Sequence, residues 1–487
     1  MIKPNVVIIM ADQLRYDLLG EHTPNINQIA SESVVFNRAY CASPICVPAR
    51  GAFFTGKYPN ETGCLINGWE PLERQHGQVQ EGIENLYTLM EEVWDSWHTG
   101  KQHLHTKDQF DLKPESQTKW ESLERRYDQY LKEHGKRKPG GKKFTALIPE
   151  MVGGTTTKLR RYSIPTVGCY EEGFDYFYDG FITKCSLEAL QNRDRTRPFL
   201  LNAMFLAPHP PLEIPDPWYS KFQNVELPYN VGRWSANQSP LQMYNLTGVL
   251  GSRYTREDWS EIWPVYTGLV SLLDDCVGTI IAELKRQNLY DNTLILFTSD
   301  HGEMLGSHGL WQKMCMYEES VRTPLFIKFP TSYQPGIKSS DALVSSVDVL
   351  PTLCEFLGLN TPDDLSGHSL MSIIEGHQAD IREEVVIQYD GNGSRGNYQR
   401  CIVTKEFKLI VDLFKDELFI ELYAAEDEQE QCNLAFNPQY RVILEQMLET
   451  LRKHMAETKD LLRIPENAFE CFHAKYIMFQ NSAITEI

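Results

Sequence analysis

The sequence predicts an α/β protein with a large sheet of mostly parallel strands and a smaller antiparallel sheet near the C-terminal end. Three apolar runs of strand length, at residues 6–10, 198–206 and 293–298, are typical of strands buried on both faces of a parallel sheet. Apolar residues recur at helical spacing over 269–284, which predicts a long helix directly before the third run. Short β-rich runs separated by turns follow after residue 384.

The first third of the chain alternates short strands and helices. After the first strand, Thr23-Pro24 has the capping residue and the first-turn proline of a helix start. Residues 34–36 form a second predicted strand, and residues 86–93 have a helical pattern. Between about 106 and 195 the pattern is irregular, so we predict no element there.

The C-terminal part predicts a helix at 344–357, a link at 367–376, and then a small antiparallel sheet with one packed helix at 442–458. The four strands of this sheet are expected at 385–389, 401–403, 408–411 and 421–423. We therefore divide the chain into an N-terminal α/β domain, 1–376, and a smaller α+β subdomain, 377–487. The tail from 462 onward is left without an assignment.

Length and composition limit the functional classes. With 487 residues the chain is too long for one simple core, so a large domain and a smaller one are expected. The net charge of −19 argues against a nucleic-acid partner, and no run of 18 apolar residues predicts a membrane span. Eleven cysteines without regular spacing predict neither a disulfide framework nor a zinc site. Because no signal peptide precedes the first strand, we expect a cytoplasmic protein, or a periplasmic or secreted one if a signal was removed.

One segment departs from the acidic composition. Residues 125–161 contain eleven Lys and Arg residues against three acidic ones. Such a segment is either a solvated insertion or a lid that attracts an anionic substrate. The lid hypothesis predicts that reversing the charges of Lys136, Arg137 and Lys138 raises KM for a large, multiply charged anionic substrate more than for a small anionic one.

Cys46 lies where a helix is expected to begin. Pro48 fits the first turn of a helix but not its interior, so Cys46 falls at the helix start and Arg50 on its opening turn. Unpaired backbone N–H groups at this end of a helix favour an anion. A cysteine in this position is an activated nucleophile.

Polar side chains follow two of the predicted buried strands. Asp12 and Gln13 follow the first run, and Asp300 and His301 follow the third. Because ligands of open α/β sheets bind beyond the carboxyl ends of the strands, these side chains can converge on one cation. Oxygen donors with one imidazole suit Ca²⁺, Mg²⁺ or Mn²⁺ better than a thiolate-preferring metal. Three basic side chains would leave the pocket net positive, as a tetrahedral oxyanion requires: Arg50, Lys101 and Lys313.

These motifs, in this order, resemble those of the sulfatases of the alkaline-phosphatase-like superfamily. The resemblance rests on Cys46-x-Pro48-x-Arg50, Gly100-Lys101-Gln102-His103, Pro208-His209-Pro210-Pro211 and the stretch from Thr298 to Leu325, which brings Lys313. It implies a large mixed, mostly parallel sheet sandwiched by helices. It also implies that a maturation enzyme converts Cys46 to Cα-formylglycine.

The resemblance further implies a mechanism. One hydroxyl of the hydrated formylglycine attacks sulfur, and deprotonation of the other by His103 expels the sulfate. The implied metal, Ca²⁺ before Mn²⁺ or Mg²⁺, is held at position 46 and by the strand-end residues Asp12, Gln13, Asp300 and His301. The substrate-binding side chains are expected to be Lys101, His209 and Lys313, with His105 as a further candidate. The expected catalytic residues are Cys46, Arg50, Lys101, His103, His209 and Lys313.

Two positions depart from many sulfatases, which have Asp at the Gln13 position and Asn at the His301 position. The combination found here also resembles phosphonate monoester and phosphodiester hydrolases and choline-sulfatase-like enzymes. The leading hypothesis is a sulfuric-ester hydrolase acting on a sulfated, glycosaminoglycan-type saccharide. The alternatives are one of these related hydrolases or a non-catalytic anion-binding protein, and an oligomeric state stays open.

Overall fold

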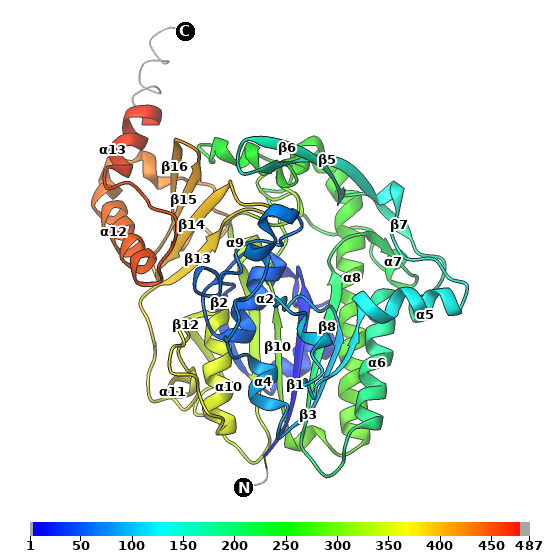
Figure 1. Ribbon diagram of the computed structural model, residues 1–487. Coiled ribbons are helices and arrows are strands. Elements are labelled where there is room, and N and C mark those ends of the chain that lie inside the picture. The colour runs from blue at the N-terminus through cyan, green and yellow to red at the C-terminus, as the bar shows by residue number, and fades with distance from the viewer. Residues whose placement is uncertain (1–2, 478–487) are drawn as a thin grey trace.

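The computed structural model describes residues 3–477 (Figure 1). Its main sheet has eight strands in the order β12-β2-β11-β10-β1-β8-β3-β4. Their bounds are β1 Asn5–Asp12, β2 Val34–Tyr40, β3 Asp95–Gly100, β4 Lys119–Ser122, β8 Phe199–Pro208, β10 Thr293–Ser299, β11 Arg322–Lys328 and β12 Ser339–Ser345. Only β11 runs antiparallel to its two neighbours, so the predicted mixed, mostly parallel sheet is confirmed.

The apolar run of β1 is continuous because both faces of the strand are buried. Val7 and Ile9 belong to one core cluster, while Ile8 and Met10 belong to another. Helices therefore cover both faces of the sheet. The first cluster is formed with α1 Pro24–Ser31, α6 Tyr178–Asn192 and α8 Arg256–Arg286, and the second with α2 Cys46–Thr55, α4 Leu86–Met90, α10 Val349–Leu357 and α11 Met371–Ile374.

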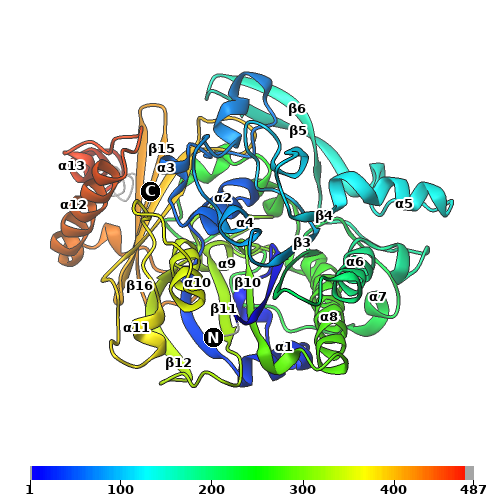
Figure 2. The same ribbon diagram turned by 60° about the horizontal axis from the view of Figure 1, so that its bottom comes forward.

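The second sheet is antiparallel and lies beside the main sheet (Figure 2). Its strands are β13 Val385–Tyr389, β14 Tyr398–Val403, β15 Phe407–Phe414 and β16 Glu417–Ala424, paired in sequence order. Helices α12 Arg441–Glu457 and α13 Ala468–Phe472 pack against it. This confirms the predicted small sheet and its helix, while the boundary at residue 376 stays a prediction.

Several predicted bounds need correction. Residues 106–195 are not irregular: they contain α6, α5 Asp128–Glu133, and a hairpin of β5 Thr145–Val152 and β6 Thr156–Ser163. The helix expected at 344–357 begins only at Val349, because β12 occupies the preceding residues. The motif around Lys101 follows a strand, β3, that the prediction omitted. Of the tail from 462 onward, residues 478–487 lie outside the described part.

Five short elements and one long helix complete the description of the site's surroundings. Short strands β7 Val167–Cys169 and β9 Leu212–Ile214 pair in parallel, and the four-residue helices α3 Pro59–Thr62, α7 Trp218–Lys221 and α9 Glu318–Val321 lie in loops. Helix α8 is long and apolar enough to cross a membrane, but 78% of its apolar stretch is buried inside the protein. It therefore fills the core between the sheet and the surrounding helices.

Candidate active site

The parallel pairing of β1 and β10 brings the two strand-end carboxylates together. Ala11 pairs with Ser299 in this ladder, so Asp12 and Asp300 lie side by side at the carboxyl ends of the strands. Beyond these strand ends, the chain turns with Gln13 in the left-handed region, at φ 68°. The backbone N–H of Gln13 donates to Asp300 Oδ1 at 3.1 Å, which fixes this carboxylate against the neighbouring strand end.

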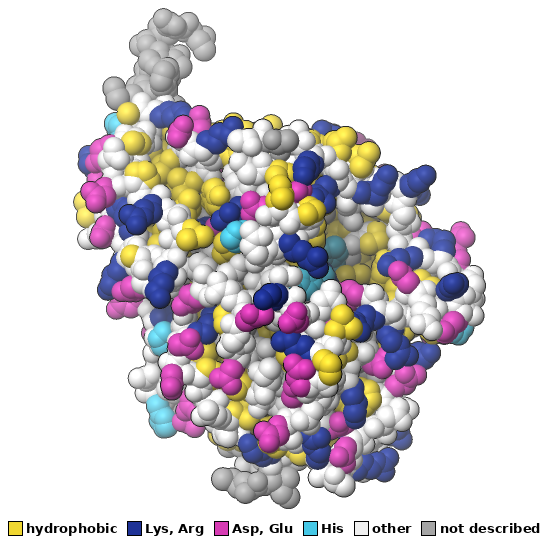
Figure 3. Space-filling model, viewed as in Figure 1, with side chains coloured by type: hydrophobic (Ala, Val, Ile, Leu, Met, Phe, Trp, Pro, Cys, Tyr) yellow, Lys and Arg dark blue, Asp and Glu magenta, His cyan; other side chains and the backbone are white. Residues whose placement is uncertain are grey.

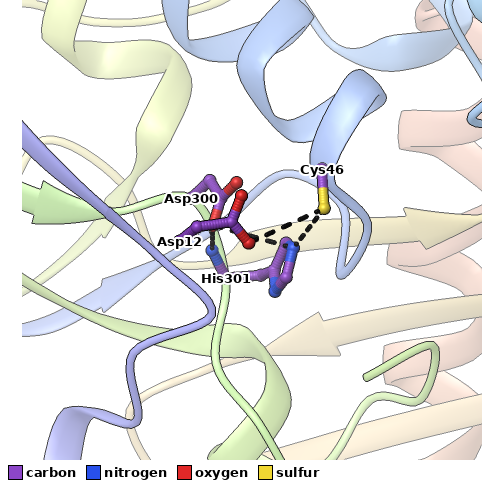
Figure 4. Close-up of side chains that lie close together, drawn as sticks. All are labelled: Asp12, Cys46, Asp300 and His301. Atoms are coloured by element: carbon purple, nitrogen blue, oxygen red, sulfur yellow. Dashed lines mark hydrogen bonds and ion pairs between the residues drawn. The ribbon is translucent and has the colours of Figure 1, made fainter. Parts of the chain in front are cut away.

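Cys46 is the first residue of α2, as the position of Pro48 predicted. The side chain of Asn67 accepts a hydrogen bond from the backbone N–H of Val47 at 3.1 Å and so satisfies part of the open helix end. Cys46 Sγ lies 3.1 Å from His301 Nε2 and 3.9 Å from Asp12 Oδ1 (Figure 4). The predicted nucleophile therefore faces the predicted metal ligands.

Arg50 lies one turn further along α2 and joins the two carboxylates. Its Nε donates to Asp300 Oδ2 at 2.9 Å, and Nη2 donates to Asp12 Oδ2 at 3.1 Å. Lys101 also donates to Asp12 Oδ2, and its Nζ lies 3.6 Å from Cys46 Sγ. The positive charges of Arg50 and Lys101 offset the two buried carboxylates, as the low dielectric of the site requires.

The residues at the strand ends fit a divalent cation. One ligand atom each from Asp12, Cys46, Asp300 and His301 lie within 4.8 Å of one another, and all four residues are buried (Figure 4). The Nδ1 of His301 lies 3.0 Å from the carbonyl oxygen of Gly302, an arrangement that places the proton on Nδ1 and leaves the lone pair of Nε2 directed at the cluster. Carboxylate oxygens with one imidazole nitrogen are a donor set for a hard divalent ion.

Gln13 has a different environment from the other predicted ligands. Its Nε2 donates to Glu303 and its Oε1 accepts from Lys313, so its amide bridges these two buried side chains. Glu303 is held in turn by the backbone N–H groups of Leu305 at 2.9 Å and Gln312 at 2.6 Å. The sequence analysis assigned no role to Glu303, although this residue lies two positions after His301 in the stretch from Thr298 to Leu325.

A cavity of about 500 Å³ opens in front of Cys46. Lys101, His103, His209 and Lys313, which the sequence predicted as site residues, all line it. Arg160 and Arg161 line it as well, and no carboxylate of residues 3–477 does. On the face seen in Figure 3 the surface is hollowed where histidine side chains are visible, and Lys and Arg side chains gather around this hollow. The cavity, which we call the reactive cavity, is therefore cationic.

Burial and neighbouring charges set the protonation states in the reactive cavity. Burial raises the pKa of the Cys46 thiol, but the positive charges of Lys101 and Lys313 outweigh it and hold the pKa well below its usual range. Burial and then the charge of Lys101 lower the pKa of His103 to about 3. Burial and then Lys313 lower the pKa of His209. Both histidines are thus neutral near pH 7, with a nitrogen available to accept a proton.

The structure separates one predicted residue from the others. His105 lines a neighbouring cavity rather than the reactive one, although its ring lies 5.3 Å from that of His103. The three basic residues that the lid hypothesis placed near the substrate lie elsewhere. Arg137 pairs with Glu213 at 2.7 Å, Lys138 with Asp128 at 2.9 Å, and Lys136 with Glu172 at 3.0 Å, and none of the three lines the reactive cavity.

Sequence reasoning missed the wall of the cavity opposite α2. This wall combines the β5–β6 hairpin with Trp69 and Asn392, which come from distant parts of the chain. Glu70 binds Lys158 at 2.7 Å and Arg160 at 3.0 Å, and so attaches the hairpin to the Trp69 loop. No local sequence pattern indicates such an assembly, because its contacts are all long-range.

Comparison with known families identifies two matching models. The model described as sulfatase matches residues 4–359, and the model described as N-sulphoglucosamine sulphohydrolase, C-terminal, matches residues 306–457. Together the two matches span most of the main sheet, the second sheet and α12. Every predicted site residue lies within the first match.

Relatives of the chain align over nearly its whole length. It is 26% identical to an arylsulfatase of Clostridium perfringens, covering 93% of this chain and 95% of the relative. It is 30% identical to a choline-sulfatase of Rhizobium meliloti, with coverages of 90% and 83%, and 24% identical to an N-acetylglucosamine-6-O-sulfatase of Bacteroides thetaiotaomicron, with coverages of 94% and 87%. Among solved structures, a phosphonate monoester hydrolase of Agrobacterium radiobacter superposes with a TM-score of 0.75 at 24% identity, covering 94% of this chain and 96% of the other.

Proposed function

The chain belongs to the sulfatase family of enzymes and has the alkaline-phosphatase-like fold of that family. From this premise we propose its substrate and its nucleophile. The substrate is the sulfate ester of an anionic saccharide of the glycosaminoglycan type. The nucleophile is a formylglycine that a maturation enzyme makes from Cys46. The observation that carries the proposal is the convergence of Cys46, Lys101 and Lys313 in one buried, cationic cavity.

The cationic lining favours a substrate with more than one negative group. Four Lys and Arg side chains line the reactive cavity without a carboxylate, and Arg161 has no carboxylate oxygen within 4 Å among the described residues. Lys101 is paired with Asp12 and Arg160 with Glu70, whereas Lys313 and Arg161 have no carboxylate partner among the described residues. These two side chains give the cavity positive charge that is not balanced by the protein. A sulfated saccharide with a second anionic group, either a sulfate or a carboxylate, would use this excess. The saccharide sulfatase among the relatives supports this substrate class.

The modified residue and the cation would supply the core chemistry. Hydrated formylglycine offers one hydroxyl for attack on sulfur and a second whose deprotonation expels the sulfate. A divalent cation, Ca²⁺ in our proposal, would be held by Asp12, Asp300 and His301, with Gln13 beside them, and would lower the pKa of the attacking hydroxyl and offset developing charge.

Other side chains bind the ester and move protons. Lys101 and Lys313 place ammonium groups at the cavity floor, where they bind the sulfate oxygens and stabilise their charge during transfer. His103 is neutral, and its buried Nδ1 has no hydrogen-bond partner in the described part of the chain, so it can accept the proton of the second hydroxyl. His209 lies after β8 on the same cavity and is suited to the leaving-group side of the ester.

Two alternatives have specific support. The similarity to a phosphonate monoester hydrolase, together with Gln13 and His301 in place of the usual Asp and Asn, favours a phosphonate or phosphate diester hydrolase with the same nucleophile. The choline-sulfatase relative favours choline sulfate as substrate. The cavity lining argues against choline, because a quaternary ammonium would meet four cations and no carboxylate.

Two experiments test the proposal. Intact-mass measurement of protein co-expressed with a formylglycine-generating enzyme should show a loss of about 18 Da, which Cys46→Ala abolishes. Matured enzyme is then assayed in parallel on an aryl sulfate, an aryl phosphonate, choline sulfate and a panel of sulfated mono- and disaccharides. The highest kcat/KM is expected on a saccharide sulfate. A phosphonate rate well above every sulfate rate would overturn the proposal, and complete absence of the mass change would favour an anion-binding protein.

A further inference from the structure

A second cavity of about 570 Å³ lies beside the reactive cavity. The two cavities share Asn67 and Trp69 in their walls. The segment after β3 contributes to both walls. Lys101 and His103 line the reactive cavity, whereas Gln102, Leu104 and His105 line the second. Each cavity is within the size range of sites for small organic ligands. A ligand bound in one can therefore extend into the other by crossing Trp69.

The second cavity differs from the first in charge. Its Arg125 pairs with Asp111 at 2.5 Å, and its Glu124 accepts from the backbone N–H of Gln102 at 3.2 Å. Arg74 also lines this cavity, so its charged lining is two arginines and two carboxylates, with His105 beside them. Among the described residues, four Lys and Arg side chains and no carboxylate line the reactive cavity, and two of these cations, Lys313 and Arg161, have no carboxylate partner. An anionic group is thus favoured in the first cavity but gains little in the second.

Amide side chains are available in the second cavity. Gln78 is half-buried and Gln109 is exposed, and neither side chain makes a hydrogen bond to another described residue. Each amide offers two donors and a carbonyl oxygen, which match the hydroxyl groups of a sugar. Such a lining recognises neutral polar ligands better than anions.

Trp69 is held firmly at the edge between the cavities. The residue is 41% exposed, which leaves part of the indole open to a ligand. The indole packs so closely on Gly393 that a Cβ there would come within 2.1 Å of the ring. The Trp69 carbonyl accepts from Arg160 Nη2 at 3.2 Å. A rigid aromatic surface of this kind can pack against the apolar face of a sugar ring at small entropic cost.

We propose that the second cavity is a subsite for an uncharged sugar unit attached to the sulfated unit in the reactive cavity. This inference rests on the proposed saccharide sulfatase function and makes it more specific. Trp69 packs against the saccharide between the two cavities, and Gln78 and Gln109 bind hydroxyl groups of the neighbouring unit. The favoured substrate is therefore an oligosaccharide of at least two units in which the unit next to the reactive one carries no charge.

The test compares three probes that share one reactive sulfated sugar, chosen from those that the matured enzyme hydrolyses. They are the monosaccharide, a disaccharide with an uncharged neighbouring unit, and the same disaccharide sulfated on that unit. In the unsubstituted enzyme kcat/KM should rise about tenfold from the monosaccharide to the uncharged disaccharide, the effect of about 1.4 kcal/mol of added binding. Sulfation of the neighbouring unit should remove most of this gain.

Variants assign the gain to the second cavity. Gln109→Ala changes only this cavity and should reduce the disaccharide-to-monosaccharide ratio about threefold, as expected for one lost hydrogen bond. Trp69→Ala should reduce the ratio further. Gln129→Ala, at an exposed position on α5 that lines neither cavity, is the matched control and should leave the ratio unchanged.

Each outcome bears on one of the two proposals. Equal kcat/KM for the three probes, or a gain that Gln109→Ala and Trp69→Ala both leave intact, would overturn the subsite while the saccharide sulfatase function stands. Preference for the doubly sulfated disaccharide would also overturn it, because the neighbouring unit would then bind to cations. If the formylglycine-bearing enzyme hydrolyses no saccharide sulfate at all, the proposed function itself fails.

Discussion

The guanidinium of Arg50 donates from Nε to Asp300 Oδ2 at 2.9 Å, and both side chains are fully buried. The same group donates from Nη2 to Asp12 at 3.1 Å, so one planar fork fixes the carboxylates of two different strands. A lysine has a single charged nitrogen and cannot reproduce this double contact. The position of Arg50 on α2 thus ties the helix that begins at Cys46 to the ends of β1 and β10.

We expect Arg50→Lys to reduce the rate of ester hydrolysis about 100-fold and to lower the content of bound divalent metal, because the two carboxylates lose their common support. Turnover and metal content by mass spectrometry after dialysis measure the two effects together. Arg126→Lys, at an exposed position paired with Glu121, is the control and should change neither. Normal metal content and rate in Arg50→Lys would refute the role assigned to Arg50.

Asp179 on α6 positions the loop that carries His209. Its Oδ1 accepts from the backbone N–H groups of Leu206 at 2.8 Å and Ala207 at 3.0 Å, at the end of β8. Burial raises the pKa of Asp179 to about 7, so the group binds these amides without needing full ionisation. Asp179→Ala removes the acceptor of one buried and one partly buried N–H group and should cost about 2–4 kcal/mol of unfolding free energy. It should also lower kcat more than it raises KM.

Asp179→Asn is the informative comparison, because its amide oxygen can accept the same two hydrogen bonds. We expect Asn to keep most of the stability and of kcat, whereas Ala loses both. Denaturant unfolding and steady-state kinetics on one aryl sulfate give the two values for each variant. Equal losses of kcat in Asn and Ala would mean that the carboxylate itself takes part in the chemistry.

The basic wall of the reactive cavity predicts which charge attracts the substrate. Arg161 lines this cavity and has no carboxylate oxygen within 4 Å among the described residues, whereas Lys138 is paired with Asp128 outside it. Arg161→Gln should therefore raise KM for a disulfated saccharide about fivefold, and this effect should weaken at high salt. Lys138→Gln should leave KM unchanged. A larger effect for Lys138→Gln would restore the lid hypothesis that the sequence suggested.

The parts of the site that lie next to one strand or helix end could be predicted from the sequence. Pro48 fixes the start of α2 at Cys46, and the apolar runs place Asp12 and Asp300 at parallel strand ends. Each inference needs only local geometry and the rule that ligands bind at the carboxyl ends of such strands. The side chains of Asp12, Asp300, Arg50 and Cys46 do lie together, while their roles stay predictions.

The rest depends on contacts between distant segments. In the β5–β6 hairpin, β6 has a polar, basic sequence and β5 contains a proline, so neither shows a clear strand pattern. Arg160 of β6 binds Glu150 of β5 and Glu70 of the Trp69 loop. Helix α6 does show helical spacing of Phe181, Ile182 and Cys185, but buried polar residues among them obscure it. Tertiary contacts, rather than local propensity, place these elements over the site.

A buried acidic pair in the second sheet predicts how stability depends on pH. Burial and the neighbouring Glu421 raise the pKa of Asp412 to about 8, and burial raises the pKa of Glu421 to about 7. Between about pH 4 and pH 8 both groups hold a proton in the folded protein that the unfolded chain has released. Their contribution to the free energy of unfolding is therefore complete below about pH 4 and is lost as the pH rises towards about 8. Asp412→Asn stays neutral and should be at least about 1 kcal/mol more stable than the parent at pH 8, with little difference at pH 4. Urea unfolding at the two pH values tests this, with the exposed Asp416→Asn as control; a pH-independent difference would contradict the titration of Asp412.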